Sequence, residues 1–268
     1  MNYPWLIEQK GESFVIDKPY GLPSFWIVEL YKHLLNKKVG HGGTLDPLAT
    51  GKLLILTGRD TKLAEKYLNH EKTYEFTLLL GAHTSSGDLE QIIEEDNAFA
   101  IPSEEAIKTA VNHFEGEYEQ IVPQYSAVKQ QGKALYRDAV KMDIPEEVLP
   151  TRLVKIPSIE VNKRETLSHQ ELKQKLEGLL KLLNESFAGA QKLNEELTGR
   201  QSGKYGNVHR GIEQALIQNI ETLKQKEYCL VSVTATVSKG TYIRSLADDI
   251  AKRLGTRGLV FELRRTGV

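Results

Sequence analysis

A single carboxylate stands in the middle of a glycine-rich stretch, and it is the strongest candidate for chemistry in this sequence. The stretch is GHGGTLDPLATG, residues 40–51, and its acid is Asp46. Flanking glycines let another backbone approach closely, and Pro47 places the acid in a tight turn. An isolated Asp-Pro normally stabilises its own turn through local hydrogen bonds. The alternative is an ionised carboxylate that acts as a base or a nucleophile.

Three common uses of such a loop fit this stretch poorly. A phosphate-binding loop at Gly51 and Lys52 would need a glycine where Asp46 stands and a Ser or Thr where Leu53 stands. A metal site would need more ligands than His41 and Asp46, because no Cys, Glu or second His lies at ligand spacing. The serine hydrolase motif G-x-S-x-G is absent as well. We therefore expect no metal at this loop and no nucleotide-binding loop.

Length and composition set limits on the class of protein. The 268 residues suffice to bury a sizeable core, and the lone cysteine, Cys229, excludes an intramolecular disulfide framework. The N-terminus lacks a signal-peptide pattern, and no apolar run approaches the roughly 18–20 residues of a membrane span. A net charge of -1 means that nucleic-acid binding would need local basic patches. We expect a soluble, cytoplasmic, single-domain monomer without a membrane segment.

The elements that must position Asp46 alternate between strands and helices. Apolar spacing predicts a helix over Ser24–Asn36, with Ser24 as its N-cap, and further helices from Ser103 and from Thr241. A short charged helix is expected over 62–69. Strands are predicted at 13–17, 52–57, 73–81 and 228–237. This pattern is typical of an α+β domain.

Two segments depart from that pattern. Residues 117–143 hold prolines, glycines, lysines and tyrosines, and we interpret them as a long ordered excursion from the core. Residues 163–226 begin with a capping box, Ser168 with Glu171, and carry two apolar stripes at helical spacing. They predict a helical-hairpin insertion, with Arg200, Lys204 and Arg210 on its connecting loop.

Six motifs resemble, in order along the chain, those of the TruB family of pseudouridine synthases. GHGGTLDPLATG is similar to the catalytic motif of that family, and it is the most specific of the six. The other stretches resemble the family's Lys-Pro motif, its tyrosine strand, its RNA-gripping insertion, its arginine motif and its C-terminal motif. These are Asp17-Lys18-Pro19-x-Gly21, Lys72-Thr73-Tyr74, residues 122–136, SKGTYIRSL at 238–246 and LRRTGV at 263–268.

The resemblance implies a fold, a reaction and a catalytic group. The fold would be the pseudouridine-synthase fold, a mixed, mostly antiparallel sheet flanked by helices. The reaction would convert a uridine in the T-loop of tRNA, position 55, to pseudouridine, and Asp46 would start glycosidic bond cleavage by a covalent or a glycal route. Arg244 would pair with Asp46, because a buried carboxylate needs a cation. Tyr74 would stack on the base and relay a proton.

The resemblance also implies how the RNA is held. The target base would be flipped out of its stack, with His41 beside it and with Tyr242 and Leu263 in the pocket. Gly42 would let the RNA backbone lie close, and Lys18 and Lys129 would contact phosphates. Lys133 and Arg137 are further basic candidates for such contacts. The partner is the T-arm of tRNA, and neither a cofactor nor an obligatory protein partner is implied.

Some features depart from the family pattern and leave alternatives open. Val140 replaces an arginine that is common in the insertion motif. We expect no C-terminal PUA domain, because residue 268 directly follows the last motif. The hairpin at 163–226 could compensate by contacting RNA through its basic loop, or it could serve packing or dimerisation. An RNA-binding or tRNA-folding factor on the same fold remains the main alternative function, and a subunit guided by partner proteins is a further one.

Overall fold

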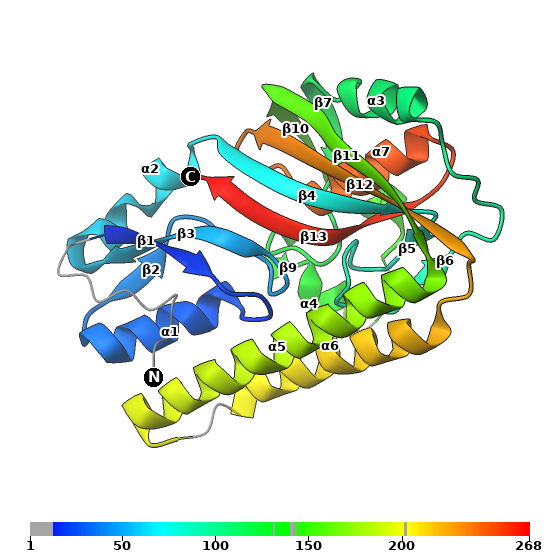
Figure 1. Ribbon diagram of the computed structural model, residues 1–268. Coiled ribbons are helices and arrows are strands. Elements are labelled where there is room, and N and C mark those ends of the chain that lie inside the picture. Colours follow the sequence, from blue (N-terminus) through cyan, green and yellow to red (C-terminus); the bar gives the residue numbers. More distant parts are fainter. Residues whose placement is uncertain (1–12, 131, 140–141, 143, 201–202) are drawn as a thin grey trace.

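The computed structural model describes residues 13–130, 132–139, 142, 144–200 and 203–268, and it is built around one mixed sheet. The strand order is β1-β3-β13-β4-β12-β11, with β2 paired to β3 (Figure 1). Among these described strands, β3 and β13 pair in parallel and the other pairs are antiparallel. The α+β class and the mostly antiparallel sheet are confirmed. The strands are β1 (Ser13–Lys18), β2 (Val39–His41), β3 (Thr50–Thr57), β4 (Lys72–Leu80), β11 (Ser158–Ser168), β12 (Glu227–Val237) and β13 (Gly258–Gly267).

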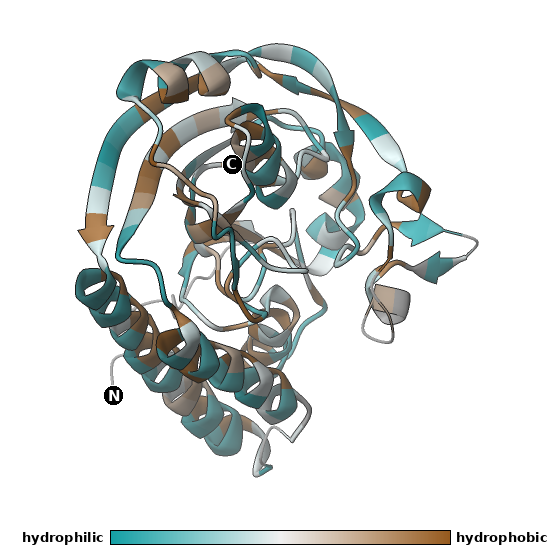
Figure 2. Cartoon of the chain, turned by 90° about the vertical axis from the view of Figure 1, so that its right-hand side faces the viewer, coloured by the Kyte–Doolittle hydropathy of each residue, from teal (hydrophilic) through white to brown (hydrophobic). Residues whose placement is uncertain are grey.

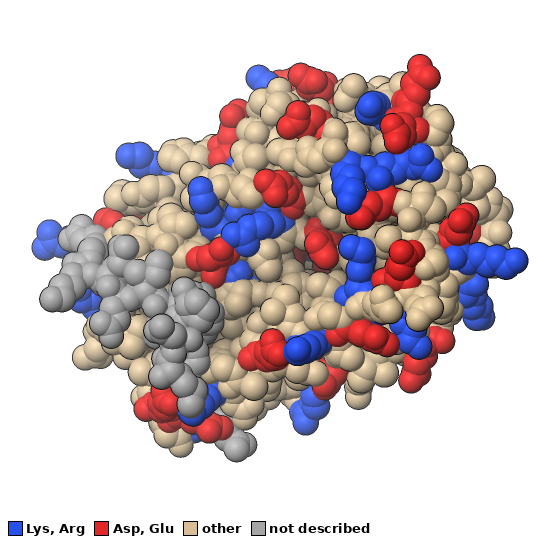
Figure 3. Space-filling view, viewed as in Figure 1, with Lys and Arg blue, Asp and Glu red and all other residues tan. Residues whose placement is uncertain are grey.

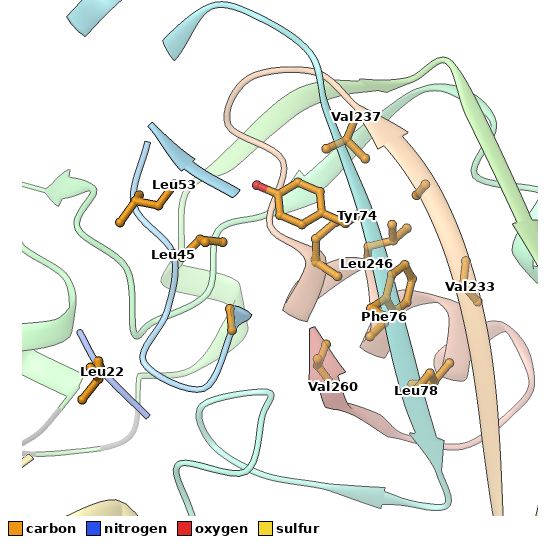
Figure 4. Close-up of a cluster of buried hydrophobic side chains, with 14 of the residues drawn as sticks. Leu22, Leu45, Leu53, Tyr74, Phe76, Leu78, Val233, Val237, Leu246 and Val260 are labelled. Atoms are coloured by element: carbon orange, nitrogen blue, oxygen red, sulfur yellow. The ribbon is translucent and has the colours of Figure 1, made fainter. Parts of the chain in front are cut away.

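Helices cover both faces of this sheet. On one face, α7 (Ile243–Arg253) and α3 (Glu104–Asn112) enclose a large apolar core with strands β4 and β12. Figure 4 shows part of that core, in which Tyr74, Phe76 and Leu78 project from β4 toward side chains of other elements. A second core forms on the other face, between the sheet and a long helical hairpin. Alternation along β12 accounts for this, because it presents apolar side chains to both layers.

The hairpin consists of α5 (His169–Thr198) and α6 (Gly203–Thr222), which lie side by side (Figure 1). Its start is the predicted capping box, because the Ser168 and Glu171 side chains each accept a hydrogen bond from the other's backbone N–H. Hydropathy colouring shows brown and teal residues interleaved along both helices, as amphipathic helices require (Figure 2). Tyr205 stacks on Trp26 of α1 (Ser24–Leu35) with ring centroids 4.8 Å apart. The hairpin therefore packs on α1 as well as on the sheet.

Four sequence predictions about these elements are wrong in detail. Residues 163–168 continue strand β11, which pairs with β12, so the segment predicted as a helical-hairpin insertion begins with strand residues. Lys204 and Arg210 lie within α6 and not in the connecting loop. Residues 117–121 belong to β7 (Gly116–Ile121), which pairs with β10 (Thr151–Ile156). Ser24 does not cap α1, because its hydroxyl is engaged elsewhere and Pro23 occupies the cap position.

The smaller elements lie in the connections between the strands and helices described above. Residues 140 and 201–202, on which parts of the sequence analysis fall, lie outside the described residues. Within the described part of the chain, no helix is long and apolar enough to span a membrane. The remaining elements are η1 (Gly58–Leu63), α2 (Ala64–Leu68), β5 (Ala82–His83), β6 (Glu94–Glu95), β8 (Lys129–Gln130), β9 (Lys133–Ala134), α4 (Tyr136–Ala139) and η2 (Glu146–Val148).

Candidate active site

The loop that carries Asp46 runs from β2 to β3 and is held by the segment that follows β1. Gly21 donates its N–H to the carbonyl of Pro47 at 2.9 Å. The Ser24 hydroxyl donates to the Leu45 carbonyl at 2.7 Å and accepts from the Leu45 N–H at 2.9 Å. These contacts fix the backbone on both sides of Asp46, whose side chain stays about one-third exposed (35%). The acid is thus both positioned and accessible.

The glycines of this loop serve packing within the protein. Gly42 is buried, and a Cβ there would lie 2.8 Å from a methyl carbon of Leu54. Gly43 is also buried and adopts a φ of +137°, a conformation that favours glycine. The Leu54 side chain occupies the space of a Cβ at Gly42, so this glycine is needed for packing within the protein, and the approach of an RNA backbone stays a prediction.

Arg244, at the start of α7, makes the predicted ion pair with Asp46. Its Nε lies 3.0 Å from a carboxylate oxygen of Asp46, and its side chain is only 6% exposed. Its two terminal nitrogens donate to the carbonyls of Ser86 (2.6 Å) and Tyr125 (2.9 Å). Burial alone would lower the pKa of Arg244, but Asp46 and Asp88 outweigh it and raise that pKa. The guanidinium therefore stays charged beside the carboxylate.

Two further acids, Asp88 and Glu90, surround the guanidinium and were missed in the sequence. The Asp88 carboxylate lies 3.8 Å from Nε of Arg244 and accepts hydrogen bonds from the Ser86 hydroxyl (2.7 Å) and the Glu90 N–H (3.0 Å). Burial raises the pKa of Asp88, and Arg244 opposes that rise. Burial, together with Asp88 and Asp46, raises the pKa of Glu90 well above its usual value. The available signal was the turn TSSGDLE, residues 84–90, in which Gly87 adopts a φ of +76° beside Arg244.

Tyr74 reaches the loop from β4 and is buried (9% exposed). In Figure 4 its ring points from the strand toward Leu45. Its hydroxyl accepts a long hydrogen bond from Arg265 at 3.5 Å. Arg265 also donates to the carbonyls of Gly43 (3.0 Å) and Lys52 (2.7 Å). Arg265 was quoted in the C-terminal motif but given no role, and here it joins Tyr74 to the loop before Asp46.

Lys18 does not face solvent, so the prediction that it contacts RNA phosphates is wrong. It is 1% exposed, and its ammonium donates to the carbonyls of Pro19 (2.9 Å), Leu22 (2.7 Å) and Pro47 (2.9 Å). Burial lowers the pKa of Lys18 to about 7, although Asp46 partly opposes the shift. Lys18 therefore holds Pro47, the residue after Asp46, through an internal hydrogen bond.

The remaining predicted residues lie at different distances from this centre. Leu263 of β13 lines a small cavity together with Asp46 and Arg244. His41 is half-buried in β2 and accepts the Gly43 N–H on Nδ1, and burial lowers its pKa. Tyr242 precedes α7 and donates its N–H to Gln120. Lys129 lies on β8, is exposed, and takes no part in the cluster around Asp46.

The cavity over Asp46 is small. Its volume is about 10 Å³, barely room for one water molecule, and Leu48 and Glu262 also line it. A base could enter only if these walls moved apart. Among the described residues, no group of three or more His, Cys, Asp or Glu side chains is arranged to hold a metal ion. The centre offers a carboxylate, a guanidinium and a phenol, which suffice for acid, base or nucleophilic chemistry.

Comparison with protein-family models decides the family. The model of the TruB family pseudouridylate synthase N-terminal domain matches residues 32–177. This chain belongs to the TruB family. Its curated relatives include proteins named tRNA pseudouridine synthase B. That of Mesoplasma florum is 33% identical over 96% of this chain and 68% of its own length, and that of Bordetella pertussis is 32% identical over 95% and 79%.

The TruB family assignment agrees with the fold, and both predictions are confirmed. A chain in the crystal structure of a Cbf5-Nop10-Gar1 complex superposes with a TM-score of 0.53 at 23% identity, covering 95% of this chain and 47% of that one. A relative from Psychrobacter cryohalolentis is 29% identical over the whole of this chain, which spans 58% of that protein. This chain thus spans about half to four-fifths of these relatives.

Proposed function

We propose that this protein is a tRNA pseudouridine synthase that isomerises the T-loop uridine at position 55. The observation that carries the proposal is the 3.0 Å ion pair between Asp46 and the buried Arg244 in a TruB-family chain. Relatives named tRNA pseudouridine synthase B support tRNA as the substrate. A protein that only binds RNA gains nothing from burying such a cluster of charges, since their desolvation is costly.

In this proposal Asp46 initiates the reaction. Its carboxylate either bonds covalently to the sugar or the base, or removes a sugar proton to give a glycal, and the N-glycosidic bond breaks. The released uracil then bonds to the same sugar through C5. In the covalent route the bond to Asp46 breaks, and in the glycal route the abstracted proton returns to the sugar. N1 takes up a proton and the C5 proton leaves. The reaction is redox-neutral and needs no cofactor. Arg244 orients the carboxylate for this step.

The other residues would hold the flipped nucleotide. Tyr74 would stack on the base and relay a proton, and Leu263 and Tyr242 would complete the pocket. His41, whose lowered pKa favours the neutral ring, would fill the space that the base leaves. Lys129 would contact a phosphate.

The decisive experiment measures pseudouridine formation in unmodified tRNA transcripts. Tritium release from 5-labelled uridine, with the site mapped, would be followed for the wild type, for Asp46→Asn, and for the matched control Asp60→Asn on η1. We expect conversion at position 55 by the wild type and the control, and none by Asp46→Asn with RNA binding kept. RNA binding without conversion by the wild type would instead favour the tRNA-folding alternative.

A further inference from the structure

A second, larger cavity lies next to the one over Asp46. Its volume is about 370 Å³, within the usual range of ligand pockets. Leu48, Glu262 and Leu263 line both cavities, so the two are neighbours across a single layer of side chains. A ligand in the larger cavity would therefore lie directly beside the target of Asp46.

The helical hairpin supplies one wall of this cavity. Leu179 and Leu182 of α5 face the sheet residues Thr77 and Ser232 across it. Leu182 is 43% exposed although it is a leucine in the middle of a 30-residue helix. The next residue, Leu183, packs against Gly21, where a Cβ would lie 2.5 Å from the Leu183 methyl carbon. The hairpin thus forms the cavity and also supports the segment that holds the Asp46 loop.

The rest of the lining carries hydrogen-bonding groups. Asn162, Thr77 and Ser232 project from adjacent strands of the sheet, and Glu75 and Glu262 add carboxylates. Tyr20, also in the wall, has a buried hydroxyl with no hydrogen-bond partner among the residues that the structure describes. An unmet buried donor is costly, so a ligand acceptor that reached it would bind favourably.

Charge decides which part of an RNA fits. Glu75 and Glu262 are acidic residues of the lining. Its basic residue, Arg264, is paired with Asp17 at 2.5 Å. A phosphate would be repelled by the two carboxylates and would find no free cation in this lining. A nucleobase suits it, because its faces pack on leucine side chains and its amino and imino groups donate to carboxylate and amide oxygens.

We propose that this hairpin-walled cavity binds an unstacked nucleobase of the substrate RNA, adjacent in sequence to the flipped uridine. The inference rests on the proposed function, since the base belongs to the same RNA. It gives the hairpin a part in substrate selection: α5 contributes an apolar surface to a base-binding site. The contact involves no phosphate, so it contributes affinity without releasing counterions.

The test combines a narrowed cavity with RNAs that lack one base. Leu182→Trp would place a bulkier side chain in the cavity, and Ile217→Ala on α6, a residue of similar exposure (41%) outside this lining, is the control. Each enzyme is tested on T-arm RNAs with a single abasic nucleotide at each position flanking the target. We expect one abasic position to lower kcat/KM of the wild type and of Ile217→Ala by about tenfold, which corresponds to about 1.4 kcal/mol from one buried base.

Non-additivity is the decisive readout. With Leu182→Trp, kcat/KM for the intact RNA should fall by a similar factor. For the abasic RNA it should fall little further, because both changes remove the same contact. Equal turnover of all abasic RNAs by the wild type, or effects that simply multiply, would overturn the inference while the proposed function stands. If the wild type converts no RNA, the proposed function fails, and the same cycle measured as binding affinity still decides on the cavity.

Discussion

At the scale of single residues, Arg244 is the group on which the centre depends most. It serves two carboxylates and two backbone carbonyls at once, and only a guanidinium has enough donors in the necessary directions. In Arg244→Lys the single ammonium cannot satisfy all of them. We expect kcat to fall by roughly 10²–10³, the usual cost of losing one preorganised charge contact. Single-turnover assays on tRNA would measure it.

The matched control for that change is Arg257→Lys. Arg257 pairs with Asp248 at 2.8 Å, and it lines neither the cavity over Asp46 nor the one beside it. Its replacement should leave kcat within about twofold, since exposed ion pairs contribute little. An Arg244→Lys enzyme as active as the control would show that Asp46 works without a guanidinium beside it.

Lys18 makes stability depend on pH in a defined direction. Burial lowers its pKa in the folded protein from 10.5 to about 7. Between these two values the unfolded chain binds more protons at this site than the folded chain does, so this group makes the free energy of unfolding rise with pH. Lys18→Met removes the group. We expect the free energy of unfolding of the wild type minus that of the variant to increase from pH 7 to pH 10, as measured by urea denaturation.

That difference separates the titration from the lost hydrogen bonds. Removing the ammonium leaves the carbonyls of Leu22 and Pro47 without this donor at every pH. This loss changes the difference in free energy of unfolding by a constant amount and does not change its slope against pH. A difference that stays flat across the range would mean that Lys18 keeps its ordinary pKa.

At the scale of elements, two serines show which caps a sequence can predict. Ser168 has Glu171 three residues later, and this reciprocal pattern identified the start of α5 correctly. Ser24 has no such partner, and its hydroxyl bonds Leu45 in a loop twenty-one residues away. Ser168→Ala should lower the free energy of unfolding by about 1 kcal/mol in urea denaturation. Ser158→Ala, an exposed serine at the start of β11, should cost less, and equal losses would deny the cap its role.

The junction of β3 and β13 gives a second element-scale prediction. Gly51 has a φ of +98°, and a Cβ there would lie 2.2 Å from the Arg265 carbonyl. Gly58 has a φ of +55° but open space around it, so Gly58→Ala isolates the conformational cost of about 1–2 kcal/mol. Gly51→Ala should cost a further ~1–3 kcal/mol, because the strands must move apart. Thermal melts of the two variants would compare them, and equal melting temperatures would contradict the close approach.

Strands with a local sequence signal could be predicted, and strands that depend on distant partners could not. Strand β12 was predicted because its apolar alternation is a local signal. Strand β7 was not, because GEYEQI alternates weakly and it is stabilised by pairing with β10, more than thirty residues away. The Asp46–Arg244 contact followed from motifs, whereas Asp88 and Glu90 follow only from the folding of residues 84–90 against α7.

At the scale of the whole molecule, the protein has no net positive charge that would attract RNA from all sides. The net charge is -1, and basic and acidic side chains are interspersed over the face seen in Figure 3. Phosphate contacts must come from local groups, and two surfaces are candidates. One is the β8–β9 segment with exposed Lys129, close to the segment whose Tyr125 carbonyl accepts from Arg244. The other is the hairpin tip with Arg200.

The packing of the tip favours the first surface. Near the tip, Tyr205 stacks on Trp26, and His209 stacks on Phe187 with centroids 4.0 Å apart. Sixteen helical residues separate Leu182, at the larger cavity, from Thr198, which places the end of α5 about 24 Å from it. The tip thus packs on α1, distant from the site. This agrees with the alternative in which the hairpin serves packing and does not contact RNA through its loop.

The salt dependence of tRNA affinity distinguishes the two surfaces. Each lost phosphate contact lowers the slope of log affinity against log salt by about one. We expect Lys129→Ala to lower the slope by that amount, and Arg200→Glu with Arg210→Glu to leave it unchanged. Leu182→Trp should weaken binding at every salt concentration with the slope kept, because its contact is to a base. If the tip variant changes the slope and Lys129→Ala does not, the hairpin is an electrostatic RNA arm, and its base-binding wall would then be secondary to its charge.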